Sequence, residues 1–181
     1  THQLGPIAKL IDINRGNRFL TLTSMASKTR GMHEWLNNSP DVDRILDSLD
    51  ITDEQAEWFR AKYLDYHFAQ GDIVTTMIKC ARGETIFLIH DCMLPRPYSR
   101  NYRVQGTKGI YMEDKDSVYF DGASPHHDWE PFAPYRNQYE HPLWKQYAAD
   151  GIHAGGHGGM DYLVLCAFVE SALGDLKPPI D

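Results

Sequence analysis

The chain has little cysteine and no long hydrophobic run, and both features narrow what it can be. Its 181 residues include three cysteines, Cys80, Cys92 and Cys166, all in apolar segments. An odd and widely spaced set argues against a disulfide framework or a cysteine zinc site, so we expect three buried thiols. No apolar segment approaches the roughly 20 residues that a membrane-spanning helix needs, so we expect no membrane span.

Positive charge is also scarce. Lysine and arginine number 18 against 25 aspartates and glutamates, which gives a formal net charge of -7. Nucleic-acid binding requires clustered basic residues, so we expect no nucleic-acid partner. Hydrophobic residues make up 42% of the chain and aromatic residues 12%, and this composition predicts one folded domain with a proper core.

The order of apolar patterns predicts an α+β fold. Thr52-Asp53-Glu54-Gln55 is a capping box that opens a helix, and Arg82-Gly83 joins two β-rich runs into a hairpin. The prolines within residues 121–142 predict a long surface loop. We expect short helical turns over residues 31–50, helices over 4–13, 52–68, 142–150 and 160–173, and strands over 18–26, 72–81, 84–92, 99–107, 109–113 and 117–120.

A glycine-rich segment, residues 154–162, is the most informative part of the chain. Four glycines surround His157, and an apolar run that predicts a largely buried helix follows. His157 and Asp161 would then lie at the N-terminus of this helix, where free N–H groups favour oxygen-rich or anionic ligands. The alternative is a plain glycine-rich loop, with Asp161 as an ordinary first-turn residue.

A proline-rich turn is the second informative segment. Pro95 and Pro97 stiffen the backbone on either side of Arg96 and precede Tyr98. Arg96 could bind a carboxylate or a sugar diol, and Tyr98 could exchange a proton. The alternative is a rigid turn with an exposed arginine and a half-buried tyrosine.

Histidines occur at the start of the chain and in its last third. His2 precedes a helix and could present its imidazole to a ligand, although a terminal histidine is usually just solvated. The later group could suggest a metal site, but glycines separate His153 from His157 and no ligand-spaced carboxylates accompany them. We therefore predict no metal. This later group comprises His126, His127, His141, His153 and His157.

Five motifs in register resemble the C-terminal part of the NAD-dependent α-N-acetylgalactosaminidases of glycoside hydrolase family 109, within the wider Gfo/Idh/MocA oxidoreductase-like group. The resemblance covers nearly the whole chain. The motifs are Thr1-His2-x-Leu4-Gly5-Pro6, Ile13-Asn14-Arg15-Gly16, Gly71-Asp72 with Thr75-Thr76, Pro95-Arg96-Pro97-Tyr98-Ser99-Arg100 with Gly106-Thr107-Lys108-Gly109, and Gly156-His157-Gly158-Gly159-Met160-Asp161.

The resemblance implies a single C-terminal domain, residues 1–181, for substrate binding and oligomerisation. Its fold would be an open, largely antiparallel or mixed sheet with helices packed on one face, and the open sheet would form a homo-oligomer interface. NAD would be bound mainly by an N-terminal Rossmann domain, which this chain lacks, because no G-x-G-x-x-G follows a strand. Which residues of this chain would touch the cofactor stays unknown.

The family mechanism implies roles for particular residues. NAD takes hydride from C3 of the sugar, a base removes the C2 proton, the aglycone leaves, water adds, and hydride returns. By position, His2 would act at the C3 hydroxyl and Tyr98 at C2, as catalytic residues. Thr1, Arg96, His157 and Asp161 would line the pocket for an N-acetylgalactosaminide-like sugar.

Two departures from the family leave the identity of the sugar substrate undecided. Residues 31–68 look longer and more acidic than expected, and residues 121–142 look divergent. The alternatives are a sugar dehydrogenase or epimerase of the same superfamily, and a non-catalytic oligomerisation or carbohydrate-binding domain. The resemblance further implies a bacterial protein, periplasmic or secreted, with the cytoplasm as the alternative.

Overall fold

The computed structural model describes residues 3–64, 66–142, 144–145 and 156–174. It confirms the α+β class, because these residues form six α-helices and two open antiparallel sheets. The predicted antiparallel pairing is therefore confirmed, with the strands divided between two sheets. The chain divides into two compact units, residues 1–97 and 98–181.

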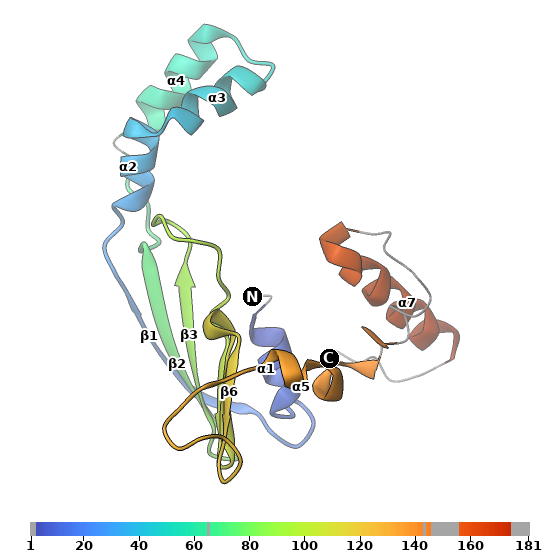
Figure 1. Ribbon diagram of the computed structural model, residues 1–181. Helices are drawn as coiled ribbons and strands as arrows, with labels where there is room; N and C mark the ends of the chain where they lie inside the picture. The colour runs from blue at the N-terminus through green and yellow to red at the C-terminus, as the bar shows by residue number, and fades with distance from the viewer. Residues whose placement is uncertain (1–2, 65, 143, 146–155, 175–181) are drawn as a thin grey trace. The chain divides into compact units, whose positions relative to one another are not determined.

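The first unit is built on a three-stranded sheet with helix α1 (Leu4–Leu10) on one face (Figure 1). The strands, in sheet order, are β1 (Phe19–Ala26), β2 (Ile73–Cys80) and β3 (Thr85–Asp91). Both pairings are antiparallel, and the predicted hairpin between β2 and β3 is confirmed. The core lies between this face and α1, and consists of buried Ile78, Cys80 and Ile86 with partly buried Leu4, Ile7, Ile11 and Ile13.

Between β1 and β2 the chain forms three helices, α2 (Gly31–Asn38), α3 (Pro40–Ser48) and α4 (Asp53–Leu64). The short helical turns predicted over residues 31–50 are helical but longer than expected, because Ser39 accepts a hydrogen bond from the Asp41 N–H at 3.2 Å and opens the nine-residue helix α3. The predicted capping box is confirmed, since Thr52 and Gln55 bond reciprocally at 2.8 and 3.3 Å.

The carboxylate of Asp72 joins this helical segment to the sheet. Asp72 is 4% exposed and lies immediately before β2. Its oxygens accept hydrogen bonds from the backbone N–H of Arg30, at 3.0 and 2.9 Å, and of Gly31, at 2.9 Å. These N–H groups at the start of α2 have no intrahelical partner, so the charged side chain supplies one.

The preceding residue, Gly71, allows the backbones around Asp72 to approach closely. A Cβ atom at Gly71 would collide with the carbonyl oxygen of Ser27, so only glycine fits there. The Gly71-Asp72 motif of the sequence is thus explained by packing and helix capping.

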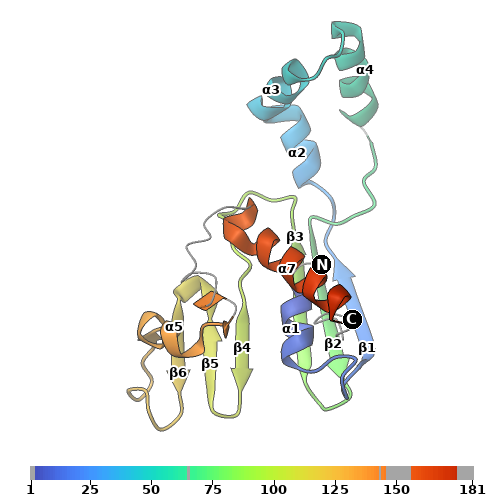
Figure 2. The ribbon, with the colours of Figure 1, turned by 90° about the vertical axis from the view of Figure 1, so that its right-hand side faces the viewer.

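The second unit contains the four-stranded antiparallel sheet, whose strands β4, β5 and β6 lie side by side in Figure 2. Its elements are β4 (Arg103–Gly106), β5 (Gly109–Met112), the 3-10 turn η1 (Glu113–Lys115), β6 (Ser117–Phe120), β7 (Glu130–Pro131), α5 (Ala133–Tyr139), η2 (Gly156–Gly159) and α7 (Met160–Leu173).

The loop predicted over residues 121–142 was wrong in part, because β7 and α5 lie inside it. Aromatic contacts hold this segment against the sheet. The rings of Tyr135 and Tyr139 lie 5.1 and 6.3 Å from the ring of Phe120, and the ring of Phe132 lies 5.1 Å from that of Tyr111. The helix predicted over 142–150 falls mostly outside the described residues.

Helix α7 has the predicted bounds but not the predicted burial. None of its residues is buried, and Phe168 and Leu173 are 68% and 85% exposed. The expectation of buried thiols was correct for Cys80, whereas Cys166 is intermediate and Cys92 is exposed. Burial, and next the charge of Glu84, raise the pKa of the Cys80 thiol. Within the described residues, no helix has the length and apolar character to cross a membrane.

Replacing Asp72 with alanine should destabilise the protein by about 2–3 kcal/mol, because it leaves the buried N–H of Gly31 and the part-buried N–H of Arg30 without a charged acceptor. Urea unfolding measures the loss. Ser39→Ala, which removes a neutral and more exposed helix cap, is the matched control and should cost about 1 kcal/mol. Equal losses of unfolding free energy in the two variants would show that the buried carboxylate contributes no more than an ordinary helix cap.

Candidate functional site

Arg96 holds the proline-rich turn together, because its guanidinium binds groups at both ends of the turn. The Arg96 Nε lies 3.2 Å from Oδ2 of Asp91. One terminal nitrogen donates to the Asp91 carbonyl oxygen at 3.2 Å, and the other donates to the Pro97 carbonyl oxygen at 3.2 Å. These contacts occupy the forked face of the guanidinium that the sequence suggested for a ligand.

Tyr98 follows this turn and is 87% exposed. The alternative of a half-buried tyrosine is therefore wrong. Its phenol group is therefore accessible to a ligand, and the two prolines and Arg96 restrain the backbone that precedes it.

His157 and Asp161 form a bonded pair at the start of α7. The imidazole Nδ1 lies 3.1 and 3.0 Å from the two carboxylate oxygens of Asp161. His157, Gly158 and Gly159 have φ values of 52°, 67° and 91°, so three successive residues take the left-handed conformation. The two glycines adopt it without strain, which explains why the sequence places them beside His157.

This geometry changes the electrostatics of the imidazole. The hydrogen bond that the imidazole donates to Asp161, and next the negative charge of Asp161, raise the pKa of His157 above its ordinary value of 6.5. The imidazole is 75% exposed, and its Nε2 is directed away from the pair, since Nδ1 faces the carboxylate. Such an oriented imidazole can donate a proton to, or accept one from, a bound hydroxyl.

The structure brings together some of the predicted site residues. His157 contacts Asp161, and Arg96 binds the carbonyl group that precedes Tyr98. Tyr98 shares no hydrogen bond with the His157–Asp161 pair among the described residues of the second unit. Thr1 and His2 lie outside the described residues, so their roles stay predictions.

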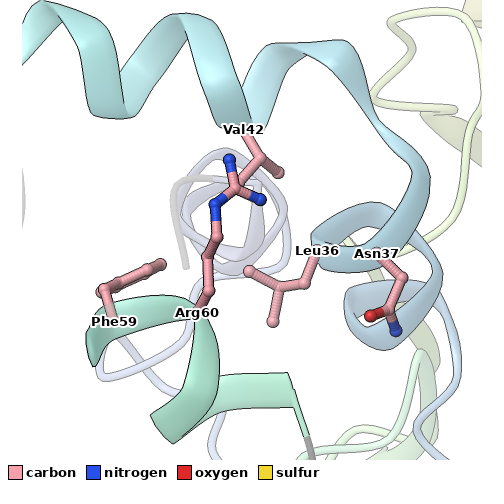
Figure 3. Close-up of a pocket in the computed structure, with 5 residues that line it drawn as sticks. All are labelled: Leu36, Asn37, Val42, Phe59 and Arg60. Carbon is pink, nitrogen blue, oxygen red and sulfur yellow. The ribbon is translucent and has the colours of Figure 1, made fainter. Parts of the chain in front are cut away.

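Two of the hollows in the described part of the chain are lined by none of the described site residues. An open hollow of about 550 Å³ lies in the second unit, on the face of the sheet that carries Tyr111, Val118 and Phe120, beside the Gly106–Gly109 turn. A cavity of about 90 Å³ lies between α2, α3 and α4, as Figure 3 shows, and its lining includes Leu36, Val42 and Arg60. The smaller one is well below the roughly 300 Å³ of a typical ligand pocket.

The motif at residues 13–16 belongs to a structural turn. Its neighbour Asn17 is 4% exposed, donates to the Ile11 carbonyl at 2.8 Å and accepts from the backbone N–H of Arg82 at 3.2 Å. An ion pair of 2.8 Å between Asp12 and Arg82 closes the same region. The motif thus joins the end of α1 to the β2–β3 hairpin.

The sequence interpretation missed Asp91, the carboxylate that holds Arg96. Its signal was an acidic residue at the end of the apolar run of β3, five positions before an arginine between two prolines.

The described strands do not form a Rossmann-type nucleotide-binding unit. Dinucleotide binding at a glycine-rich turn requires a parallel βαβ unit, whereas every pairing of named strands in the described residues is antiparallel. Within the described part of the chain, no group of three or more histidine, cysteine, aspartate or glutamate side chains is placed to hold a metal ion.

Comparison with known proteins identifies the family. The family model described as the glycosyl hydrolase 109 C-terminal domain matches residues 1–181. A glycosyl hydrolase family 109 protein of Stenotrophomonas maltophilia is 45% identical over all of this chain and 36% of its own length. The alpha-N-acetylgalactosaminidase of Tannerella forsythia is 40% identical over all of this chain and 35% of its own length, and that of Shewanella oneidensis is 35% identical over 93% and 34%.

The fold and these matches define the class first: an α+β domain of a glycosyl hydrolase family whose matched relatives named here are bacterial. The chain belongs to the C-terminal domain of glycosyl hydrolase family 109. It spans about a third of the length of the curated relatives that it matches.

The raised pKa of His157 predicts a defined titration. The charged imidazole is favoured in the folded protein, so any stability that it adds is full below the unfolded pKa and is lost as pH rises through the folded pKa. An NMR titration of the imidazole should give a midpoint above 6.5, and Asp161→Asn should lower that midpoint. Glu170→Gln on the same helix is the control and should leave it unchanged; an equal shift in both variants would contradict a specific pair.

Proposed function

We propose that this chain is the substrate-binding and catalytic half of an NAD-dependent glycosidase that acts on α-N-acetylgalactosaminides or related sugars. The observation that carries the proposal is the family match over the whole chain, since two of the similar proteins are named alpha-N-acetylgalactosaminidase. The exposed phenol group of Tyr98, on a turn held by Arg96, supports it, because such a group can meet a sugar hydroxyl or a C–H proton.

The remaining part of the parent protein would hold NAD, which removes hydride from the sugar and later returns it. The residues of this chain would move protons and bind the sugar. Tyr98 would act at C2, where the acidified proton is removed before the aglycone leaves. His2 would polarise or deprotonate the C3 hydroxyl, with Thr1 lining the same pocket.

The contacts of His157 and Arg96 favour a different role for each residue. His157, fixed by Asp161, is suited to bind a sugar hydroxyl through Nε2. The Arg96 guanidinium binds Asp91 and the Pro97 carbonyl oxygen, and these contacts favour a role in orienting Tyr98 over direct sugar binding.

We further propose that the first sheet supports a homo-oligomer through the face opposite α1. By register, Met77 pairs with Phe87, Thr75 with Ile89, and Met25 with Thr75, so their side chains share this face. The large apolar members are exposed: Met25 by 75%, Met77 by 49%, Phe87 by 68% and Ile89 by 57%. A contiguous exposed apolar patch of this kind favours a protein interface.

Cleavage of an aryl α-N-acetylgalactosaminide by the full-length parent protein in deuterated water tests the glycosidase proposal. We expect release of the aryl group together with deuterium at C2 of the sugar, because elimination and readdition exchange that proton. Tyr98→Phe should lower kcat by about a hundredfold or more, as expected for loss of an acid–base group.

Three other outcomes would count against the proposal in different ways. Cleavage without exchange at C2 would rule out the elimination mechanism. Absence of cleavage, with NAD still bound, would favour a sugar dehydrogenase or epimerase. Tyr98→Phe with unchanged kcat would remove Tyr98 from the reaction.

The interface proposal predicts that Phe87→Asp lowers the mass of the full-length protein in solution, because a buried charge would oppose association. Light scattering coupled to size-exclusion chromatography measures this mass. Leu49→Asp, at a residue that is 50% exposed in the helical segment, is the control and should leave the mass unchanged. An unchanged mass for Phe87→Asp would contradict the interface.

A further inference from the structure

A closed ring of contacts links Asp91, the last residue of β3, to the turn before Tyr98. The Asp91 side chain binds Arg96 Nε, its carbonyl oxygen accepts from a second guanidinium nitrogen, and the third nitrogen reaches the Pro97 carbonyl oxygen, each at 3.2 Å. One arginine thus ties the start of the segment 91–97 to its end. Arginine can do this because its planar fork presents several donors in fixed directions.

Asp91 is the fixed member of this ring. It pairs with Ile73 in the β2–β3 ladder, and its side chain is 20% exposed against 41% for Arg96. Oδ2 binds Arg96, whereas Oδ1 is buried and has no hydrogen-bond partner among the described residues. The sheet therefore holds the carboxylate, and the carboxylate directs the guanidinium.

The Pro97 carbonyl is the point at which this ring acts on Tyr98. A peptide unit is planar, so the Pro97 carbonyl oxygen and the Tyr98 nitrogen and Cα lie in one plane. The proline rings fix φ at 95 and 97, which leaves the orientation of this plane as the main remaining freedom. The hydrogen bond from Arg96 to the Pro97 oxygen restrains that plane and so fixes the position of the Tyr98 Cα, from which the side chain starts.

We propose that Asp91 is a positioning residue for Tyr98, acting through Arg96. This inference rests on the proposed function, in which Tyr98 acts on the sugar. Exposed ion pairs add little stability, so the ring affects the placement of the phenol group more than the folding of the chain. A misplacement of about 1 Å at a reacting group can cost about a hundredfold in rate.

The test uses kcat and KM of the full-length protein for an aryl α-N-acetylgalactosaminide, with thermal unfolding to confirm the fold. Asp91→Ala removes the anchor, and Arg96→Lys keeps the charge but cannot reach both carbonyl oxygens. We expect each to lower kcat by about ten- to a hundredfold, with KM within about twofold of wild type. The double variant should be no worse than the poorer single variant, because both act through one ring.

Two variants separate positioning from other roles. Asp91→Asn keeps one oxygen for Arg96 and places its amide at the unpaired side, so it should restore most of kcat. Arg82→Lys changes an ion pair at the other end of the strands, of 2.8 Å and with Arg82 47% exposed, and should leave kcat unchanged.

The contrary outcomes are distinct. Unchanged kcat in Asp91→Ala and Arg96→Lys, with loss of activity in Tyr98→Phe, would overturn the positioning role alone. Asp91→Asn as inactive as Asp91→Ala would also overturn it, since the charge and not the contact would then matter. Full activity in Tyr98→Phe would overturn the proposed function of Tyr98 itself.

Discussion

Antiparallel pairing of β2 with both β1 and β3 is the constraint on which residues 3–97 depend. It places Ile78 and Cys80 under α1 and sets Asp72 and Asp91 at one end of the sheet, because Ile73 pairs with Asp91. One carboxylate then begins the helical segment α2–α4, and the other holds the turn that leads to Tyr98. A shift of register by one residue would reverse the two faces and separate both carboxylates from their partners.

The motifs that carry the family resemblance have two different physical meanings. Asp72, and Asn17 beside the motif at residues 13–16, are buried, and their hydrogen bonds join helices and turns to the first sheet. Tyr98 and His157 are exposed, yet the backbone before Tyr98 is clamped and the imidazole of His157 is oriented by Asp161. Buried polar groups stabilise a fold, whereas exposed groups in fixed orientations are suited to bind and transform a ligand.

The proposed reaction divides the work between this chain and the rest of a parent protein. The described strands are antiparallel, and the chain spans about a third of its relatives. In the proposal, proton movement and sugar binding would fall to Tyr98, His157 and the predicted His2, while the hydride carrier would lie elsewhere. The acidic helical segment and the apolar face around Phe87 are the surfaces that the proposed chemistry does not use.

The sequence by itself determined the α+β class, the capping box at Thr52, the β2–β3 hairpin and the family, because these depend on local spacing and on residue identity. Only the tertiary structure decided that Arg96 turns back to Asp91 and Pro97, that α5 forms within the expected loop, and that the apolar side chains of α7 are exposed. The Arg96 contacts depend on the path of the backbone through the proline turn, α5 depends on contacts such as Phe120 with Tyr139, and the exposure of α7 is a matter of burial, which apolar periodicity does not specify.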